Sequence, residues 1–432
     1  MSEPTARVWD PSTAAISPEA KALVEEAVLD VRRIENEITK SNGARPRALS
    51  AQNRLKAVAT VGALILDALA HAISQDTEYL LIKLDNNWLA RGPKEQPARN
   101  GTVGDRLSAL ELSNWLEVNR SLRINQRFRT CYWAGPMLLK RAKALGVELK
   151  DIGSQGESQS IELRTAKDRS DVGFTREIHF RPTAETQIIE TRVRELNQHL
   201  QAGLIENRLG STPPIDVRRR HVKRVFLEGD FQRGGRTGGP AFWLNLPKVR
   251  RRHDLLLDAG PVAEIDIQAA IPSIAYALVG KRPQEDPYGI PSLTKMKRGM
   301  IKIALMQLFW RRHSPRGRFS DEVQAHIKGH YRYREVVDAI REWNAPIAHM
   351  LGAEEPIGAT LMWHESEIII DATLRAFKAG ATALPLHDAL IMPASQIELG
   401  KHVLEGAFRD RLGVPPTLKV DFDGSRLQLC TG

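Results

Sequence analysis

Residues 381–393, ATALPLHDALIMP, contain two short apolar runs on either side of the polar pair His387-Asp388. This pattern predicts the two strands of a tight hairpin, with the pair in its turn. A third apolar run, Val262 to Ile267, carries Asp266 near its end and continues into an apolar helical stretch. Because helical patterns lie between these strands, the chain is predicted to have an α+β fold.

The acids at the strand ends suggest a metal site. Asp266 and Asp388 are 122 residues apart in sequence, and a sheet can bring the tips of their two strands together. Carboxylates are the hard oxygen ligands that Mg²⁺ and Mn²⁺ prefer. Transfer of a nucleotide to a nucleic-acid 3′ end requires two such ions about 4 Å apart and little covalent chemistry from the protein. We therefore expect Asp266 and Asp388 to be catalytic metal ligands. The alternatives are a turn aspartate at 388 and a helix N-cap at 266.

A helical pattern from Lys295 to Trp310 places four candidate side chains on one stripe. Arg298 and Lys302 are four residues apart, so both cations project from one face and can bind a triphosphate. Met306 and Trp310 continue the stripe and are candidates for contact with the incoming base. The alternative is a solvated helix face with Met306 and Trp310 in the core.

Positive charge is concentrated in one part of the chain. Residues 217–318 contain 21 Lys and Arg against 8 Asp and Glu, a net charge of +13, whereas the whole chain carries +10. Such clusters are typical of proteins that bind nucleic-acid phosphates, although solvated faces give the same pattern. The residues expected to contact nucleic acid are Arg218, Arg219, Arg220, Arg236, Lys248 and Arg251.

Composition indicates a folded protein of a reducing compartment. The 432 residues are enough for two or three domains, and 42% hydrophobic content is ordinary for a globular chain. Cys131 and Cys430 have no neighbouring cysteine or histidine at zinc-ligand spacing. The first 17 residues lack the pattern of a signal peptide. The apolar stretch from Ala57 to Ile73 is short for a membrane span and predicts a buried helix. We expect a cytoplasmic protein without a membrane partner.

From Val225 to Phe422 the chain resembles the single-subunit polymerases, that is, the palm and fingers of family A bacterial DNA polymerase I and of bacteriophage and mitochondrial RNA polymerases. The resemblance rests on motifs that occur in the family's order: Gly235-Arg236-Thr237, Asn245-Leu246-Pro247, Asp266, Arg298 to Lys302, and His387-Asp388. It implies that Asp266 and Asp388 bind two Mg²⁺ or Mn²⁺ ions, that Lys302 is catalytic, and that His387 supports the turn.

The resemblance also implies an architecture and partners. Residues 225–432 would form the palm, with fingers inserted at about 281–345. Residues 1–152 would form a mostly helical, thumb-like domain, because helical patterns run from the N-cap Ser17 to Asn42, from Leu55 to Ile73, from Thr77 to Leu89 and from Leu107 to Leu122. A linker and template-contact region, with a helix from about Ala184 to Leu200, would span 153–224. The implied partners are primer-template DNA or a DNA/RNA hybrid and nucleoside triphosphates, with other replication or mobile-element proteins as further candidates.

Position 271 bears on the choice of sugar. The DNA polymerases carry a glutamate five residues after the first aspartate, and this chain has Ile271 there. Met306, four residues after Lys302, is closer to the RNA polymerases. A branched side chain at 271 would crowd a 2′-hydroxyl, and this slightly favours a DNA polymerase. The alternatives are a single-subunit RNA polymerase or primase, and a non-catalytic nucleic-acid-binding protein on a degenerate polymerase fold.

Overall fold

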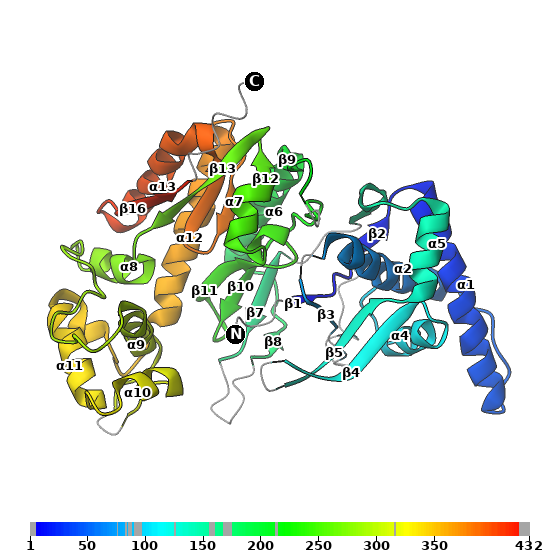
Figure 1. Ribbon diagram of the computed structural model, residues 1–432, viewed down its shortest axis with the longest axis horizontal. Coiled ribbons are helices and arrows are strands. Elements are labelled where there is room, and N and C mark those ends of the chain that lie inside the picture. The colour runs from blue at the N-terminus through cyan, green and yellow to red at the C-terminus, as the bar shows by residue number, and fades with distance from the viewer. Residues whose placement is uncertain are drawn as a thin grey trace. The chain divides into compact units, whose positions relative to one another are not determined.

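The computed structural model of the chain consists of two compact units (Figure 1). It describes residues 6–75, 77–82, 84, 89, 97–124, 127–154, 160–166, 175–211, 215–314 and 317–422. The first unit comprises Met1–Gln159, Glu206–Val222 and Gly239–Leu255, and the second comprises Ser160–Ile205, Lys223–Gly238 and Leu256–Gly432. The sequence predicted three consecutive regions with boundaries at 152 and 224. The two compact units are instead each built from three separate segments of the chain. Cys430 and residues 155–159 of the expected linker lie outside the described residues.

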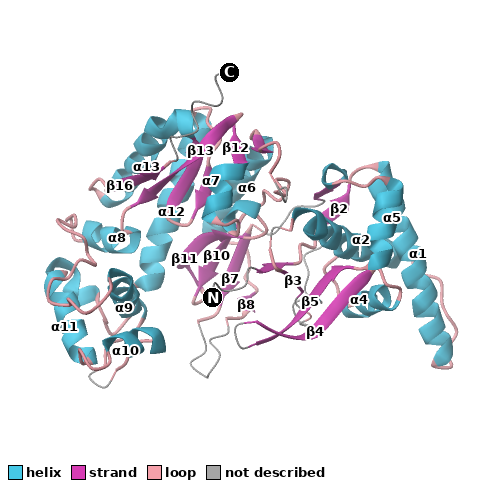
Figure 2. Ribbon diagram, in the orientation of Figure 1, coloured by secondary structure: helices cyan, strands magenta, loops and turns pink. Residues whose placement is uncertain are grey.

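The first unit combines helices with a four-stranded sheet (Figure 2). Its helices are α1 (Pro18–Ser41), α2 (Ala51–Ser74), α4 (Val103–Leu112), α5 (Pro136–Leu145) and α7 (Lys248–Asp254), with the 3₁₀ turns η1 (Leu149–Asp151) and η2 (Phe242–Leu244). The sheet has the order β1 (Ala6–Val8), β3 (Tyr79–Ile82), β5 (Arg127–Ala134), β4 (Leu116–Ile124). A separate two-stranded pair joins β2 (Thr13–Ala15) to β6 (Ile152–Ser154).

The expectation of a mostly helical N-terminal part is wrong in two places. Residues 79–82 form strand β3, in which buried and half-buried side chains alternate as in a sheet. The helical pattern expected over 107–122 ends at Leu112, because Asn114 adopts a left-handed conformation (φ 58°) and turns the chain into β4. The first helix is confirmed, with Ser17 Oγ accepting a hydrogen bond from the Ala20 amide at 3.1 Å.

Helix α2 is the central helix of the first unit. By length and composition alone it could cross a membrane, since an 18-residue stretch of it has a mean hydropathy of 1.7. However, 78% of that stretch is buried inside the structure. Leu64, Ile65 and Leu66 have no exposed surface and pack in the core with residues of α1 and α4. The buried helix expected at 57–73 is thus confirmed.

The second unit contains two sheets. One has the order β11 (Asp230–Gly238), β10 (Lys223–Leu227), β7 (Ile161–Arg164), β8 (Glu177–Ile178). In the other, β13 (Gly260–Ile267) pairs antiparallel with β15 (Ala389–Pro393), β16 (Leu418–Asp421) and β12 (Leu255–Leu257), and β15 pairs with β14 (Leu384–Leu386). The short strand β9 (Ile205–Asn207) lies where the chain passes from this unit to the first.

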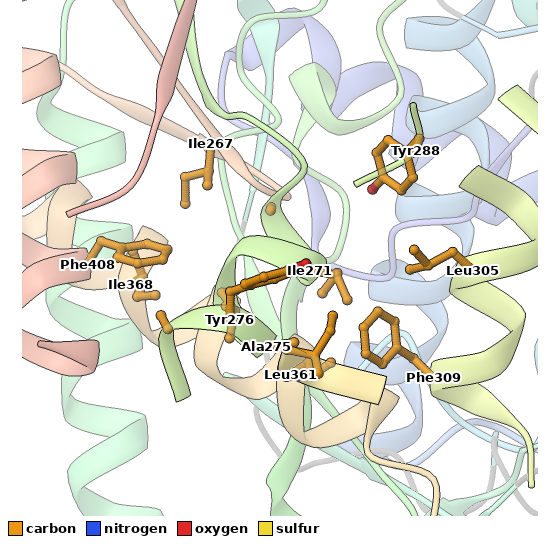
Figure 3. Close-up of a cluster of buried hydrophobic side chains, with 14 of the residues drawn as sticks. Ile267, Ile271, Ala275, Tyr276, Tyr288, Leu305, Phe309, Leu361, Ile368 and Phe408 are labelled. Carbon is orange, nitrogen blue, oxygen red and sulfur yellow. The ribbon is translucent and has the colours of Figure 1, made fainter. Parts of the chain in front are cut away.

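Helices of the second unit pack against these sheets and against one another. They are α6 (Ala184–Ala202), α8 (Ala270–Leu278), α9 (Arg298–Trp310), α10 (Asp321–Ile327), α11 (Tyr333–Trp343), α12 (Gly358–Lys378) and α13 (Ile397–Leu412), with the 3₁₀ turns η3 (Ala345–Met350) and η4 (Ala394–Gln396). One apolar core joins β13, α8, α9, α12 and α13 (Figure 3). The mixture of helices and sheets confirms the α+β class, and the hairpin predicted around His387-Asp388 is confirmed as β14 and β15.

A buried ion pair fixes strand β1 against α2. Arg7 Nη1 donates to Asp67 Oδ1 at 2.7 Å, and both side chains are 1% exposed. The Asp67 carboxylate also accepts hydrogen bonds from the Asp10 amide at 3.1 Å and the Tyr132 hydroxyl at 3.4 Å. Removing one charge of such a pair leaves the other buried and uncompensated.

We predict that Asp67→Asn lowers the free energy of unfolding by about 3 kcal/mol, because the Arg7 guanidinium would then face a neutral amide. Glu37→Gln is the matched control, since its ion pair with Arg33 is more than half exposed (58% and 56%) and should contribute less than about 1 kcal/mol. Chemical denaturation followed by circular dichroism measures both. Equal effects of the two substitutions would contradict the assignment.

Candidate active site

The two predicted catalytic acids lie close together in the second sheet, with Asp266 on β13 and Asp388 in the turn between β14 and β15. In the antiparallel register of β13 and β15, Asp266 is opposite Ala389, the residue that follows Asp388. The Ile267 amide donates to the Asp388 carbonyl oxygen at 3.1 Å. Both acids are half-buried. The pairing confirms that the sheet brings these two positions together, while their catalytic role stays a prediction.

Neither acid has the local structural role that was the alternative. The N-cap of α8 is Ala269, in a left-handed conformation without a side-chain cap, so Asp266 does not cap this helix. The Asp388 carboxylate accepts no hydrogen bond from the part of the chain that the structure describes, so it does not stabilise its own turn. His387, the first turn residue, is exposed and has φ 51°, a conformation that costs free energy for a residue with a Cβ.

A buried glutamate whose carboxyl interacts electrostatically with Asp388 was not recognised from the sequence as a site residue. Glu365, on α12, has no exposed surface, and its Oε2 accepts a hydrogen bond from Arg236 Nε. Its Oε1 is buried without a hydrogen-bond partner among the described residues. Burial raises the pKa of Glu365, Arg236 opposes this effect, and the nearby charge of Asp388 adds to it. The charges of Glu365 and Asp388 therefore affect one another. The one sequence signal for a buried glutamate was its position in the middle of an apolar helix.

Glycines carry Arg236 into this environment. Gly234 and Gly235 have φ +78° and +72°, which L-residues rarely adopt. A Cβ on Gly235 would come within 2.5 Å of Arg224 Nη2 and 2.9 Å of the Phe226 ring. The β10–β11 register shifts next to Phe226, which is typical of a bulge. The Gly-Gly-Arg motif thus combines a bulge that requires glycine with an arginine that reaches α12.

Arg298 is held at the start of α9 by a neighbouring loop. Its Nε and Nη2 donate to the two carboxylate oxygens of Asp286 at 2.6 and 2.9 Å, and its guanidinium lies 4.9 Å from the centre of the Tyr288 ring. Burial raises the pKa of Tyr288, Arg298 opposes this effect, and Asp286 and Asp388 add to it. Tyr288 is therefore close enough to interact electrostatically with both Arg298 and Asp388.

The other residues predicted on this helix differ in exposure. Lys302 is exposed and forms no ion pair within the described ranges. Met306 and Trp310 are half-buried and pack against the main core. The Trp310 indole lies against Gly358, where an added Cβ would come within 2.6 Å of the ring. Contact of these two side chains with a base stays a prediction.

Ile271 lies in the first turn of α8 and is 5% exposed. It belongs to the cluster that contains Leu305 and Phe309 of α9 (Figure 3). The position fits a core role and is also adjacent to the strand that carries Asp266. The proposed effect on sugar choice is untested.

The predicted nucleic-acid-binding residues are divided between the units. Arg218, Arg219, Arg220, Lys248 and Arg251 belong to the first unit, and Arg236 belongs to the second. Lys248 is exposed, and the others are half-buried. Arg218 forms two hydrogen bonds to the buried Asp216, at 2.7 and 2.8 Å, so part of its charge is already compensated. Arg236 is similarly engaged by Glu365.

A second charged cluster lies on α12. The Glu367 carboxylate pairs with Arg224, with Arg192 at 2.7 Å and with Arg411 at 3.8 Å. Arg411 Nε donates to His364 Nδ1 at 3.0 Å. Burial, followed by the positive charge of Arg411, lowers the pKa of His364 to about 4. The imidazole is therefore neutral in the folded protein at neutral pH.

His364 should make the second unit sensitive to acid. A histidine whose pKa is lower in the folded state stabilises the fold above its ordinary pKa of 6.5, and this stability is lost as the pH falls toward 4. We predict that His364→Asn, which keeps a hydrogen-bond acceptor for Arg411, reduces the loss of stability between pH 6.5 and 4 by up to about 2 kcal/mol, allowing for partial exposure of the ring. Denaturation at several pH values tests this, and parallel pH curves for the variant and the wild type would contradict it.

The comparisons with known proteins find structural similarity at low sequence identity. No family model and no curated protein matches the chain. Among solved structures, it is similar to the POL domain of Pol1 from M. smegmatis in complex with a DNA primer-template and dNTP, with 11% identity and a TM-score of 0.31. The match covers 95% of this chain and 66% of that chain. A TM-score of this size does not show a shared fold, so any function must be argued from the residues above.

Proposed function

We propose that the chain is a template-directed nucleotidyltransferase that extends a nucleic-acid 3′ end by two-metal-ion catalysis, with DNA as the favoured product. The observation that carries the proposal is the β13–β15 register, which sets Asp266 opposite Ala389 and so next to Asp388 in the turn before β15. The Arg298 guanidinium lies 4.9 Å from the centre of the Tyr288 ring at the start of α9, and the charge of Asp388 contributes to the raised pKa of Tyr288. Metal-binding carboxylates and phosphate-binding cations are the two parts that phosphoryl transfer needs.

The donor set fits hard divalent cations. Asp266 and Asp388 are both carboxylates, both half-buried, and the Asp388 oxygens accept no hydrogen bond from the described residues. No group of three or more His, Cys, Asp or Glu side chains that could hold a metal is found among those residues. Two protein carboxylates leave coordination positions for water and substrate phosphates, as is usual for Mg²⁺ sites. Bound Mg²⁺ or Mn²⁺ would activate the 3′-hydroxyl and neutralise charge on the leaving pyrophosphate.

The remaining side chains then have separate tasks. In the proposed reaction, Asp266 and Asp388 hold the cations, and Arg298 and Lys302 bind the triphosphate and stabilise its charge. The hairpin and β13 belong to a palm, α9 to α11 to fingers, and the first unit to the binding of the template. A cytoplasmic location is part of the same proposal. A protein that only bound nucleic acid would not need paired carboxylates next to phosphate-binding cations.

The first test removes the acids. Asp266→Asn and Asp388→Asn should each abolish primer extension in Mg²⁺, because each substitution removes a metal-binding carboxylate. Binding of a primed duplex in a gel-shift assay should stay within about twofold, because the basic residues are unchanged. Asp410→Asn is a matched control, since Asp410 is an exposed acid of the same unit that pairs with Arg375. Extension by either variant at the wild-type rate would contradict the proposal.

The second test concerns the sugar. If Ile271 lies beneath the ribose, a 2′-hydroxyl is crowded and left unpaired, at a cost of about 1 to 3 kcal/mol. The wild type should then prefer dNTPs over NTPs by roughly ten- to a hundredfold, and Ile271→Ala should raise NTP incorporation relative to dNTP. Ile274→Ala, on the same helix and fully buried, controls for lost packing. The preference is measured as the ratio of dATP to ATP incorporated when both compete in one reaction. A wild type that prefers ATP would favour an RNA polymerase or primase.

A further inference from the structure

The loop before α9 arranges a carboxylate and an aromatic ring around Arg298. Asp286 Oδ2 accepts from Arg298 Nε at 2.6 Å, and Oδ1 accepts from Nη2 at 2.9 Å. The Tyr288 amide donates to the same Oδ1 at 3.2 Å, and the Tyr288 ring lies under the guanidinium. The carboxylate therefore occupies the side-on edge of the arginine, and the ring supports one of its faces.

The end-on edge of Arg298, next to the one that Asp286 uses, is left for another ligand. A guanidinium has five N–H donors, of which Asp286 uses one on Nε and one on Nη2. The two N–H groups of Nη1 and the second of Nη2 make no hydrogen bond to the described residues, and the side chain is 56% exposed. The second N–H of Nη2 and one N–H of Nη1 form the end-on edge, which can bind a phosphate through two parallel hydrogen bonds.

The loop itself is anchored to the core. Trp343 Nε1 donates to the Asp286 carbonyl at 3.0 Å, and Asn344 Nδ2 donates to the Pro287 carbonyl at 3.1 Å. Asn344 is completely buried, and its Oδ1 accepts from the Tyr276 hydroxyl at 3.2 Å. Tyr276 belongs to α8, which follows the strand of Asp266. A chain of hydrogen bonds thus connects α8 to the backbone of the loop that carries Asp286.

We propose that Asp286 is a positioning residue that fixes the Arg298 guanidinium so that its end-on edge binds the triphosphate of the incoming nucleotide. The proposal rests on the proposed function and names a residue that acts through Arg298 without contacting the substrate. A long arginine side chain loses rotamer freedom when it binds a ligand, and a carboxylate that has already ordered it reduces this loss. Asp286 does not compete with the triphosphate, because it uses a different edge of the guanidinium.

The kinetic consequence is a separable effect on nucleotide affinity. Asp286→Ala should raise the KM for the nucleotide about three- to tenfold and leave kcat nearly unchanged, because the contact orders Arg298 before the substrate binds. Asp286→Asn keeps an acceptor for the Tyr288 amide and for one Arg298 donor, so its KM should lie between those of the wild type and Asp286→Ala. Glu285→Ala removes a neighbouring exposed acid and should leave KM unchanged.

A double-mutant cycle separates this role from a purely structural one. In an Arg298→Ala background, Asp286→Ala should have no further effect on KM, because its only route to the substrate has been removed. A structural role would give the same loss in both backgrounds. A decrease of KM in Asp286→Ala would instead show that the carboxylate competes with the triphosphate, and either result would overturn the proposal.

A direct measurement of nucleotide binding distinguishes failure of the positioning role of Asp286 from failure of the proposed nucleotidyltransferase function. The full chain with a primed duplex ending in a dideoxynucleotide is titrated with radiolabelled dATP in Mg²⁺ by equilibrium dialysis, alongside the extension assay. Weaker binding by Asp286→Ala than by the wild type supports the positioning role. A wild type that extends primers, together with an Asp286→Ala variant of equal dATP affinity, overturns only that role. A wild type that neither extends nor binds overturns the proposed function as well.

Discussion

The antiparallel register between β13 and β15 is the constraint on which the candidate site depends. Every residue of β15 is buried, and Ile265 of β13 packs into the main core. Strand β13 lies between β15 and β16 and pairs with both. A slip of one residue would exchange the two faces of β13 and move apolar side chains out of the core. The core therefore fixes the register, and the register sets Asp266 beside the turn that contains Asp388. The two acids need no contact of their own to stay close.

The site also depends on pairs of opposite charges contributed by different elements. Arg236 on β11 is engaged by Glu365 on α12, Arg224 on β10 by Glu367 on α12, and Arg298 on α9 by Asp286 in the preceding loop. Each arginine fork is matched by a carboxylate that fixes its orientation. Partly buried pairs of this kind add little net stability. The same contacts attach β10 and β11 to the long helix that runs through the second unit.

Local apolar patterns in the sequence predicted many of the helices and strands, but only part of the pairing between them. The hairpin, β13, α6 and α9 follow from apolar runs with clear ends, and the two acids stood out because each lies at the tip of such a run. Glu365 was missed because a glutamate within a helix is usually solvated, and only its contact with Arg236 shows otherwise. The return of residues 206–222 and 239–255 to the first unit could not be predicted, since it depends on packing between segments far apart in sequence. Strand β4 was taken for a helix because the helical pattern of α4 leads directly into it.

The measurement that tests the central claim most directly is a count of bound divalent ions. Electron paramagnetic resonance of Mn²⁺ can determine how many ions bind to the full chain in complex with a primed duplex that ends in a dideoxynucleotide and the next complementary dNTP. If Asp266 and Asp388 hold the catalytic ions, the wild type binds two Mn²⁺ ions more tightly than the dNTP alone does, and the double variant Asp266→Asn/Asp388→Asn loses this binding. Equal Mn²⁺ binding by the two proteins would contradict the account.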